Sequence, residues 1–191
     1  MSATRANGIF IMVPLFWEAV VEPWRRPGFR LSAVIRSCAW LLLVPVGLAS
    51  YCIYLHFTFG DALAFVHATA TWGRTFTTPW RATVNAWVIY SGVYRRLFLA
   101  TEAIAIATLV AGFYARIRMS YLLYAAAMLL MLLSNTIFEA LPRYVSIVFP
   151  LQIALAAATV RSEALYLTAL AASAALMTLC LGLYVGGYWF T

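Results

Sequence analysis

The stretch LLLVPVGLASYCIYL, residues 41–55, decides the fold class of this chain. It carries no charged side chain and lies within a largely apolar run from Ser32 to His56. About 20 apolar residues are the length that an α-helix needs to cross the hydrocarbon core of a bilayer. Pro45 and Gly47 interrupt the run, and membrane helices tolerate both, with a kink at the proline. The stretch therefore predicts a membrane-spanning helix.

The composition of the whole chain points the same way. Of its 191 residues, 65% are hydrophobic and only 10% are charged, whereas a soluble domain has about 25% charged residues. A lipid bilayer solvates such a surface directly, because its hydrocarbon tails are themselves apolar. We therefore expect an all-α, polytopic transmembrane helix bundle that forms a single membrane domain.

Four further apolar runs follow the first and predict four further spans, at about 97–114, 121–133, 144–160 and 165–185. The central expectation is five spans, with a range of four to six. Residues 1–31 contain an apolar run too short to cross a bilayer, so they are expected to be an N-terminal interfacial segment. The transmembrane domain then covers 32–191, with a long outer loop at 57–96.

All 13 basic residues are arginines, and the net charge is +7. In a soluble protein this excess would favour nucleic-acid binding, but here the arginines flank apolar runs, so they indicate orientation and not a nucleic-acid partner. The basic N-terminal region is placed on the cytoplasmic side together with Arg116, Arg118 and Arg161. Four arginines then fall in the outer loop, where part of the set is free to serve a site: Arg74, Arg81, Arg95 and Arg96.

The outer loop has features of the membrane interface. Gly60-Asp61 resembles a helix start with Asp61 as N-cap, and Asp61, Phe65, Ala68 and Trp72 then recur on one helical face. This spacing predicts a short interfacial amphipathic helix. An aromatic belt at headgroup depth is expected from Trp72, Trp80, Trp87, Tyr90 and Tyr94.

Two polar clusters fall on the predicted outer face. The Asp61 cluster comprises Asp61, His67, Trp72 and Arg74, and the Arg143 cluster comprises Glu139, Pro142, Arg143 and Tyr144. Guanidinium groups pair with phosphates and aromatic rings stack on sugars, so the clusters are candidates for binding a phosphate-bearing lipid and a sugar. Each feature also has an ordinary membrane explanation, namely helix capping by Asp61, anchoring by Trp72, and a helix start with snorkelling at Pro142-Arg143.

Glu102 lies inside the predicted span 97–114, near its outer end. An ionisable residue within a span is a functional candidate, because its burial in lipid is costly. Pairing with Arg95 or Arg96 near the interface is the alternative.

Motifs for other chemistry are absent from the sequence. It holds no Ser-His-Asp arrangement, HExxH, Walker loop or GxGxxG. The three cysteines and two histidines have no metal-ligand spacing. We expect no metal and no cofactor.

The two clusters carry a resemblance to a known family. The run YLHFTFGDALAFVHATATWGR, residues 54–74, resembles the GDPLAF…W segment of bacterial glycosyltransferases related to the PIG-V mannosyltransferases. The run ALPRYVSIVFPLQIALA, residues 140–156, resembles their LPRY…FP segment, and the final GGYWF resembles their C-terminal end. Two motifs in the same order match the C-terminal half of that family.

The resemblance implies a multi-pass protein of the bacterial inner membrane, of the class that takes a sugar from a polyprenyl-phosphate donor on the outer face. It implies that Asp61, Phe65 and Trp72 line or support the site together with Pro142, Arg143 and Tyr144, and that Arg143 contacts the donor phosphate. The family's N-terminal half, with its acidic residue in the first outer loop, has no counterpart here. Asp61 and Glu139 are weak candidates for a general base.

Two functions remain open at this point. The first is a membrane-embedded subunit derived from such a glycosyltransferase, not catalytic alone, that serves as an accessory component of a larger membrane complex. The second is half of a split glycosyltransferase that transfers a mannose-like sugar from a polyprenyl-phosphate donor. Both require the bilayer and at least one other membrane protein chain as partners, and the small-residue run 169–175 suits helix packing.

Overall fold

The computed structural model describes residues 6–25, 31–138, 141–160 and 162–186. These residues are almost entirely helical, and the part of the chain that is described holds one isolated β-bridge, between Phe76 and Asn135. The expected all-α fold is confirmed.

The chain divides into two compact units. Unit 1 comprises Met1–Thr75 and Arg118–Met128, and unit 2 comprises Phe76–Ile117 and Leu129–Thr191.

Unit 1 begins with a helical run that changes from 3₁₀ to α to π and back to α along its length. Its consecutive segments are η1 (Ala6–Ile11), α1 (Met12–Phe16), the π-helical η2 (Trp17–Val21) and α2 (Glu22–Trp24). The η2 segment packs against α3 (Leu31–Leu41). Glu18 of η2 also accepts a hydrogen bond from Arg118, which ties the run to a segment 100 residues away in sequence.

The predicted first span is present, but it is interrupted. It consists of α3 followed by α4 (Leu43–Phe59), with Leu42 as a turn between them. Pro45 has no N–H to give to the carbonyl of Leu41, four residues earlier, so the helical ladder is broken just before it. Gly60 ends α4 in the left-handed conformation, with φ of 74°, and its N–H donates to the carbonyl of His56 at 2.9 Å.

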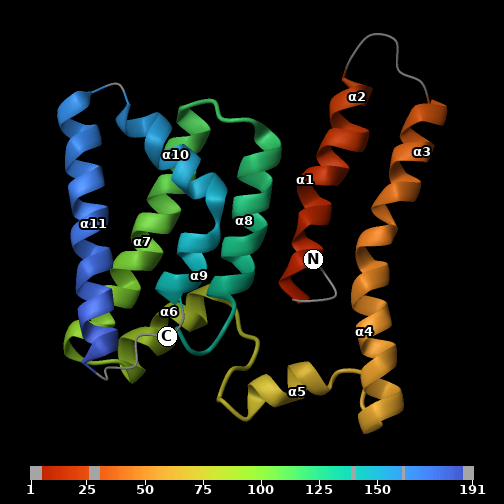
Figure 1. Cartoon of the computed structure of the whole chain (residues 1–191), viewed down its shortest axis with the longest axis horizontal. Coiled ribbons are helices and arrows are strands. Elements are labelled where there is room, and N and C mark those ends of the chain that lie inside the picture. Colours follow the sequence, from red (N-terminus) through yellow and green to blue (C-terminus); the bar gives the residue numbers. More distant parts are fainter. Residues whose placement is uncertain (1–5, 26–30, 139–140, 161, 187–191) are drawn as a thin grey trace. The chain divides into compact units, whose positions relative to one another are not determined.

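Unit 2 is built around α7 (Gly92–Tyr114). Three helices pack on it: α6 (Pro79–Ile89), α9 (Leu141–Ile147) and α10 (Phe149–Thr159). The last helix, α11 (Glu163–Val185), packs on α10 (Figure 1). Ser162 caps α11, because its Oγ accepts the N–H of Leu165 at 3.4 Å.

The predicted span 144–160 is a bent pair of helices. The axes of α9 and α10 differ by 74°, and Val148 between them has non-helical φ and ψ of −75° and 80°. Pro150 explains the break, because it cannot donate to the carbonyl of Ser146 and its ring collides with that carbonyl. Beyond the break, Pro150, Leu151 and Ala154 form the buried face of α10.

Within the described residues, three helices are long and apolar enough to cross a membrane, and the bent pair raises the number to four. The long ones are Val34–Phe59, Gly92–Tyr114 and Glu163–Gly182. The predicted span 121–133 corresponds to α8 (Met119–Leu133), an apolar helix of only 15 residues. By length and composition the count therefore falls below the central expectation of five and reaches the lower end of the expected range.

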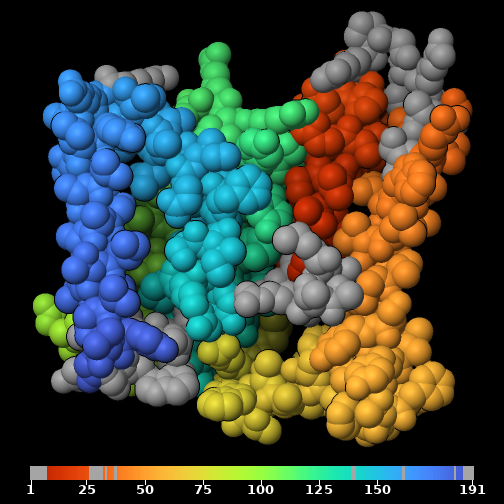
Figure 2. Space-filling model, viewed as in Figure 1, coloured from red at the N-terminus to blue at the C-terminus, as the bar shows by residue number. Residues whose placement is uncertain are grey.

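The last span is the most exposed of the three. No residue in the apolar window of Glu163–Gly182 is buried within the structure. Large apolar side chains such as Leu170, Met177 and Leu181 are more than half exposed. In the space-filling view, the helix forms the blue edge of its unit (Figure 2). This exposure is typical of a helix that faces lipid or another chain.

Candidate functional site

The Asp61 cluster is formed by a tight turn and a short helix of unit 1. After Gly60, residues 61–63 form the turn, and α5 (Ala64–Ala70) begins at Ala64 and not at Asp61. Leu63 is the N-cap residue, so the prediction that Asp61 caps the helix directly is wrong. The difference arises because Gly60 closes α4 and leaves Asp61 to start a separate turn.

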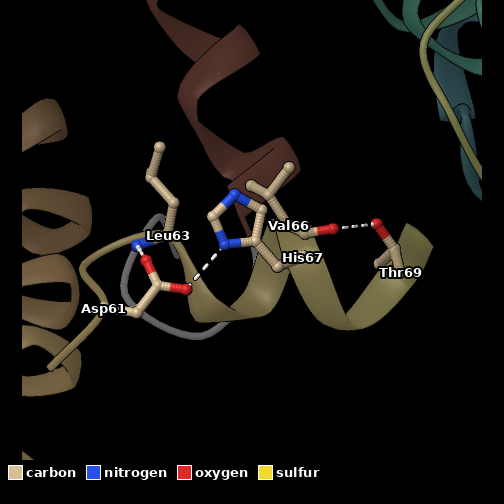
Figure 3. Close-up of polar contacts among 5 residues, drawn as sticks. All are labelled: Asp61, Leu63, Val66, His67 and Thr69. Carbon is tan, nitrogen blue, oxygen red and sulfur yellow. Dashed lines mark hydrogen bonds and ion pairs between the residues drawn. The ribbon is translucent and has the colours of Figure 1, made fainter. Parts of the chain in front are cut away.

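The carboxylate of Asp61 binds two groups within its own segment. One oxygen accepts the backbone N–H of Leu63 at 2.9 Å, as aspartates in turns commonly do. The other accepts a hydrogen bond from Nδ1 of His67 at 2.6 Å (Figure 3). Both side chains are substantially exposed, by 40% for Asp61 and 67% for His67. The carboxylate therefore organises the start of α5.

These contacts favour the ionised form of Asp61. The hydrogen bond from His67, followed by that from the N–H of Leu63, holds the pKa of the Asp61 carboxyl below its ordinary value. A lowered folded-state pKa stabilises the turn at pH values above the ordinary carboxyl value. That contribution is lost as the pH falls through the lowered pKa.

We predict that the Asp61 carboxyl titrates at a lower pH than a free aspartate and that His67→Gln shifts its midpoint upward. Asp61 is the only aspartate in the chain, so labelling aspartate with ¹³C at the carboxyl carbon gives one resonance to follow by NMR. His56→Gln is the matched control, because His56 is the weakest contributor to the lowered pKa. Equal shifts in the two histidine variants would contradict the assignment of His67 as the main partner.

The other members of the Asp61 cluster do not converge on its carboxylate. Phe65 packs on Tyr51 of α4, with ring centroids 5.8 Å apart. Trp72 lies in the turn after α5 and is 72% exposed. Arg74 is half-buried in the same turn, where its N–H donates to the carbonyl of Thr69 at 3.2 Å. The structure thus brings Asp61 and His67 together and leaves Trp72 as an exposed aromatic side chain.

The Arg143 cluster lies in the first turn of α9, in unit 2. Pro142 occupies the second position of that helix, where its missing N–H costs nothing. The exposed guanidinium of Arg143 lies over the ring of Tyr144, 5.2 Å from its centroid. Glu139 lies outside the described residues.

Glu102 lies beside Ala103, the midpoint of α7, and not near the end of the helix as the sequence suggested. The helix begins five residues before the predicted span, at Gly92, and this extension moves its centre. The side chain is buried, and its Oε1 lies 2.6 Å from Oγ1 of Thr83 on α6.

Neither arginine of α7 pairs with Glu102. Arg95 stacks on Trp87, 4.6 Å from its ring centroid, and its Nη1 donates to the Trp87 carbonyl at 3.5 Å. Arg96 donates from Nε to the carbonyl of Gly92 at 3.4 Å. Both guanidiniums therefore stay at the first turns of the helix, where α6 meets α7.

Two further polar residues of unit 2 join segments that are distant in sequence. Thr83 reaches Glu102 from 19 residues away, and the hydroxyl of Tyr90 accepts the N–H of Phe138 at 3.1 Å. Sequence spacing does not predict either contact, because each depends on how α6 and the loop after α8 pack against α7. Tyr90 had been expected only as part of the aromatic belt.

Comparisons of the chain with protein-family models, with curated proteins and with solved structures give no match. The resemblance to the glycosyltransferases therefore rests on the two quoted motifs. Among the described residues, no three His, Cys, Asp or Glu side chains gather as a metal-binding group.

Proposed function

We propose that this chain is a membrane-embedded subunit related to PIG-V-like glycosyltransferases, not catalytic by itself, that acts as an accessory component of a larger complex in the bacterial inner membrane. The observation that carries this proposal is the state of Asp61. Its two carboxylate oxygens are bound to His67 and Leu63, and its pKa is lowered. A general base needs a carboxylate that is free to reach an acceptor hydroxyl and basic enough to take its proton.

The apolar surface supports the accessory role. Large hydrophobic side chains are exposed on every long helix, and the window of α11 is entirely unburied. Within that helix, Ala169, Ala172 and Ser173 provide small side chains that allow another helix to approach closely. At least one other membrane protein chain and the lipid bilayer are the partners that fit this surface.

The alternative is half of a split glycosyltransferase that uses a polyprenyl-phosphate sugar, and one observation favours it. Arg143 is exposed at the start of a bent span, and its stacking on Tyr144 holds the guanidinium plane in place. A guanidinium held in this way can bind a phosphate through two parallel hydrogen bonds. In this alternative a second chain supplies the catalytic carboxylate.

Purification of the chain from native membranes, followed by mass spectrometry of the co-purifying chains, tests the proposal. We expect a stoichiometric membrane complex that assembles equally well with wild type, Asp61→Ala and Arg143→Ala. A chain that always purifies alone would count decisively against an accessory subunit. Sugar transfer by the complex from a polyprenyl-phosphate donor, abolished by Arg143→Ala with assembly intact, would favour the split enzyme.

A further inference from the structure

Glu102 occupies the centre of the buried face of α7. Phe98 and Ala105 flank it one turn away on either side and are 4% and 1% exposed, while Glu102 itself is 8% exposed. The helix of 23 residues is about 35 Å long at 1.5 Å per residue, close to the thickness of a hydrocarbon core. A carboxyl group at its midpoint is therefore remote from both membrane surfaces.

The hydrogen bonds of Thr83 bear on whether the Glu102 carboxyl carries a proton. Oγ1 of Thr83 lies 2.6 Å from Oε1 of Glu102 and 3.1 Å from the carbonyl oxygen of Pro79. A hydroxyl has one proton to donate and can also accept. If Glu102 were ionised, both neighbours of Thr83 would be acceptors competing for that proton. If Glu102 carries a proton, it donates to Thr83, Thr83 donates to Pro79, and both contacts are satisfied.

The charged groups nearby do not compensate a carboxylate. The elements that pack most closely on α7 are α6, α9 and α10, and α10 carries no charged residue. The basic residues of the other elements are Arg81 on α6, Arg143 on α9, and Arg95 and Arg96 on α7 itself. Arg81 and Arg143 are exposed, and Arg95 and Arg96 bind Trp87 and Gly92.

Tyrosines of α7, of the turn before it and of α9 make contacts with other groups. The rings of Tyr90 and Tyr94 contact Phe98, one turn before Glu102, and the hydroxyl of Tyr90 binds the N–H of Phe138. Tyr144 of α9 lies under Arg143. Among the described residues no ion pair to Glu102 is formed, and the cost of an ionised carboxyl in hydrocarbon is large when no cation is paired with it.

We propose that Glu102 is an intramembrane proton-binding site, a neutral carboxylic acid whose O–H donates to Thr83 inside the helical core of unit 2. The inference does not depend on the glycosyltransferase resemblance. It gives this unit a group that can bind and release a proton within the membrane, with the hydroxyl of Thr83 as its fixed partner.

Infrared spectroscopy of the purified full-length chain in lipid nanodiscs tests the proposal directly. The difference between wild type and Glu102→Gln is expected to contain one carboxylic-acid C=O band at neutral pH. Thr83→Val is expected to shift this band, because the acid loses its acceptor, and Thr83→Ser, which keeps the hydroxyl, is expected to leave it near its wild-type position. A difference spectrum that holds only carboxylate bands at neutral pH would overturn the proposal.

Labelling with dicyclohexylcarbodiimide, which adds to protonated carboxyls in apolar surroundings, gives an independent measurement. Peptide mass spectrometry is expected to find the adduct on Glu102 and not on the exposed Glu163, with a yield that falls as the pH rises. Loss of the adduct on replacing choline chloride by sodium chloride at constant pH would instead assign the carboxylate to a metal cation. If Glu102→Gln fails to fold, as judged by circular dichroism, the band shift between wild type and Thr83→Val decides the question.

Discussion

Truncation of Phe138 to alanine is expected to destabilise the chain by about 3–5 kcal/mol, the range for removing a buried aromatic ring. Phe138 is 1% exposed and is among the largest fully buried side chains of the described residues. It lies in the loop that leads from α8 to α9, and its N–H donates to the hydroxyl of Tyr90 at 3.1 Å. The backbone N–H therefore ties this loop to the turn between α6 and α7, and the ring is buried in the core of unit 2.

The measurement is the free energy of unfolding in mixed micelles as the fraction of denaturing detergent rises. Phe113→Ala is the matched control, because Phe113 is 60% exposed on α7 and its truncation removes little packing within the chain. We expect the control to change the unfolding free energy by less than about 0.5 kcal/mol. Equal losses in the two variants would show that the loop does not contribute to the core of unit 2.

Apolar runs predict the helices of this chain well, because in lipid only a helix satisfies all of its own backbone groups. The runs at 97–114 and 165–185 correspond to α7 and α11 within a few residues at either end. The run at 144–160 fails as a single helix at Pro150, although the same proline was visible in the sequence. How far a proline bends a helix depends on the packing around it, and here the bend reaches 74°.

The polar residues were harder to assign than the spans. The pairing of Asp61 with His67 joins residues of one short segment, so sequence could place both in one cluster, but it assigned Asp61 to the wrong position in the helix. The sequence indicated that burying the ionisable side chain of Glu102 within a span costs free energy. Its partner Thr83 was missed, because α6 was expected only as part of an outer loop and not as a helix packed on α7.

Replacement of Ala154 by phenylalanine is expected to destabilise the chain by about 1–3 kcal/mol, the usual cost of overpacking a core. Ala154 is fully buried on α10, the helix that packs most extensively on α7. Lipid tails are as apolar as leucine, so membrane helices associate largely through close packing, which small residues permit. A ring at this position would force α10 away from its neighbours.

Ala156→Phe makes the same substitution two residues later on α10, where the side chain is exposed. Under the same detergent titration it is expected to leave the unfolding free energy within about 0.5 kcal/mol of wild type. The pair separates two views of the bent span. If α10 is held by close contact at Ala154, only that variant loses stability, and small residues contribute to the core of unit 2 beside the large apolar ones. If both variants behave alike, close packing at Ala154 is not what holds α10 against α7.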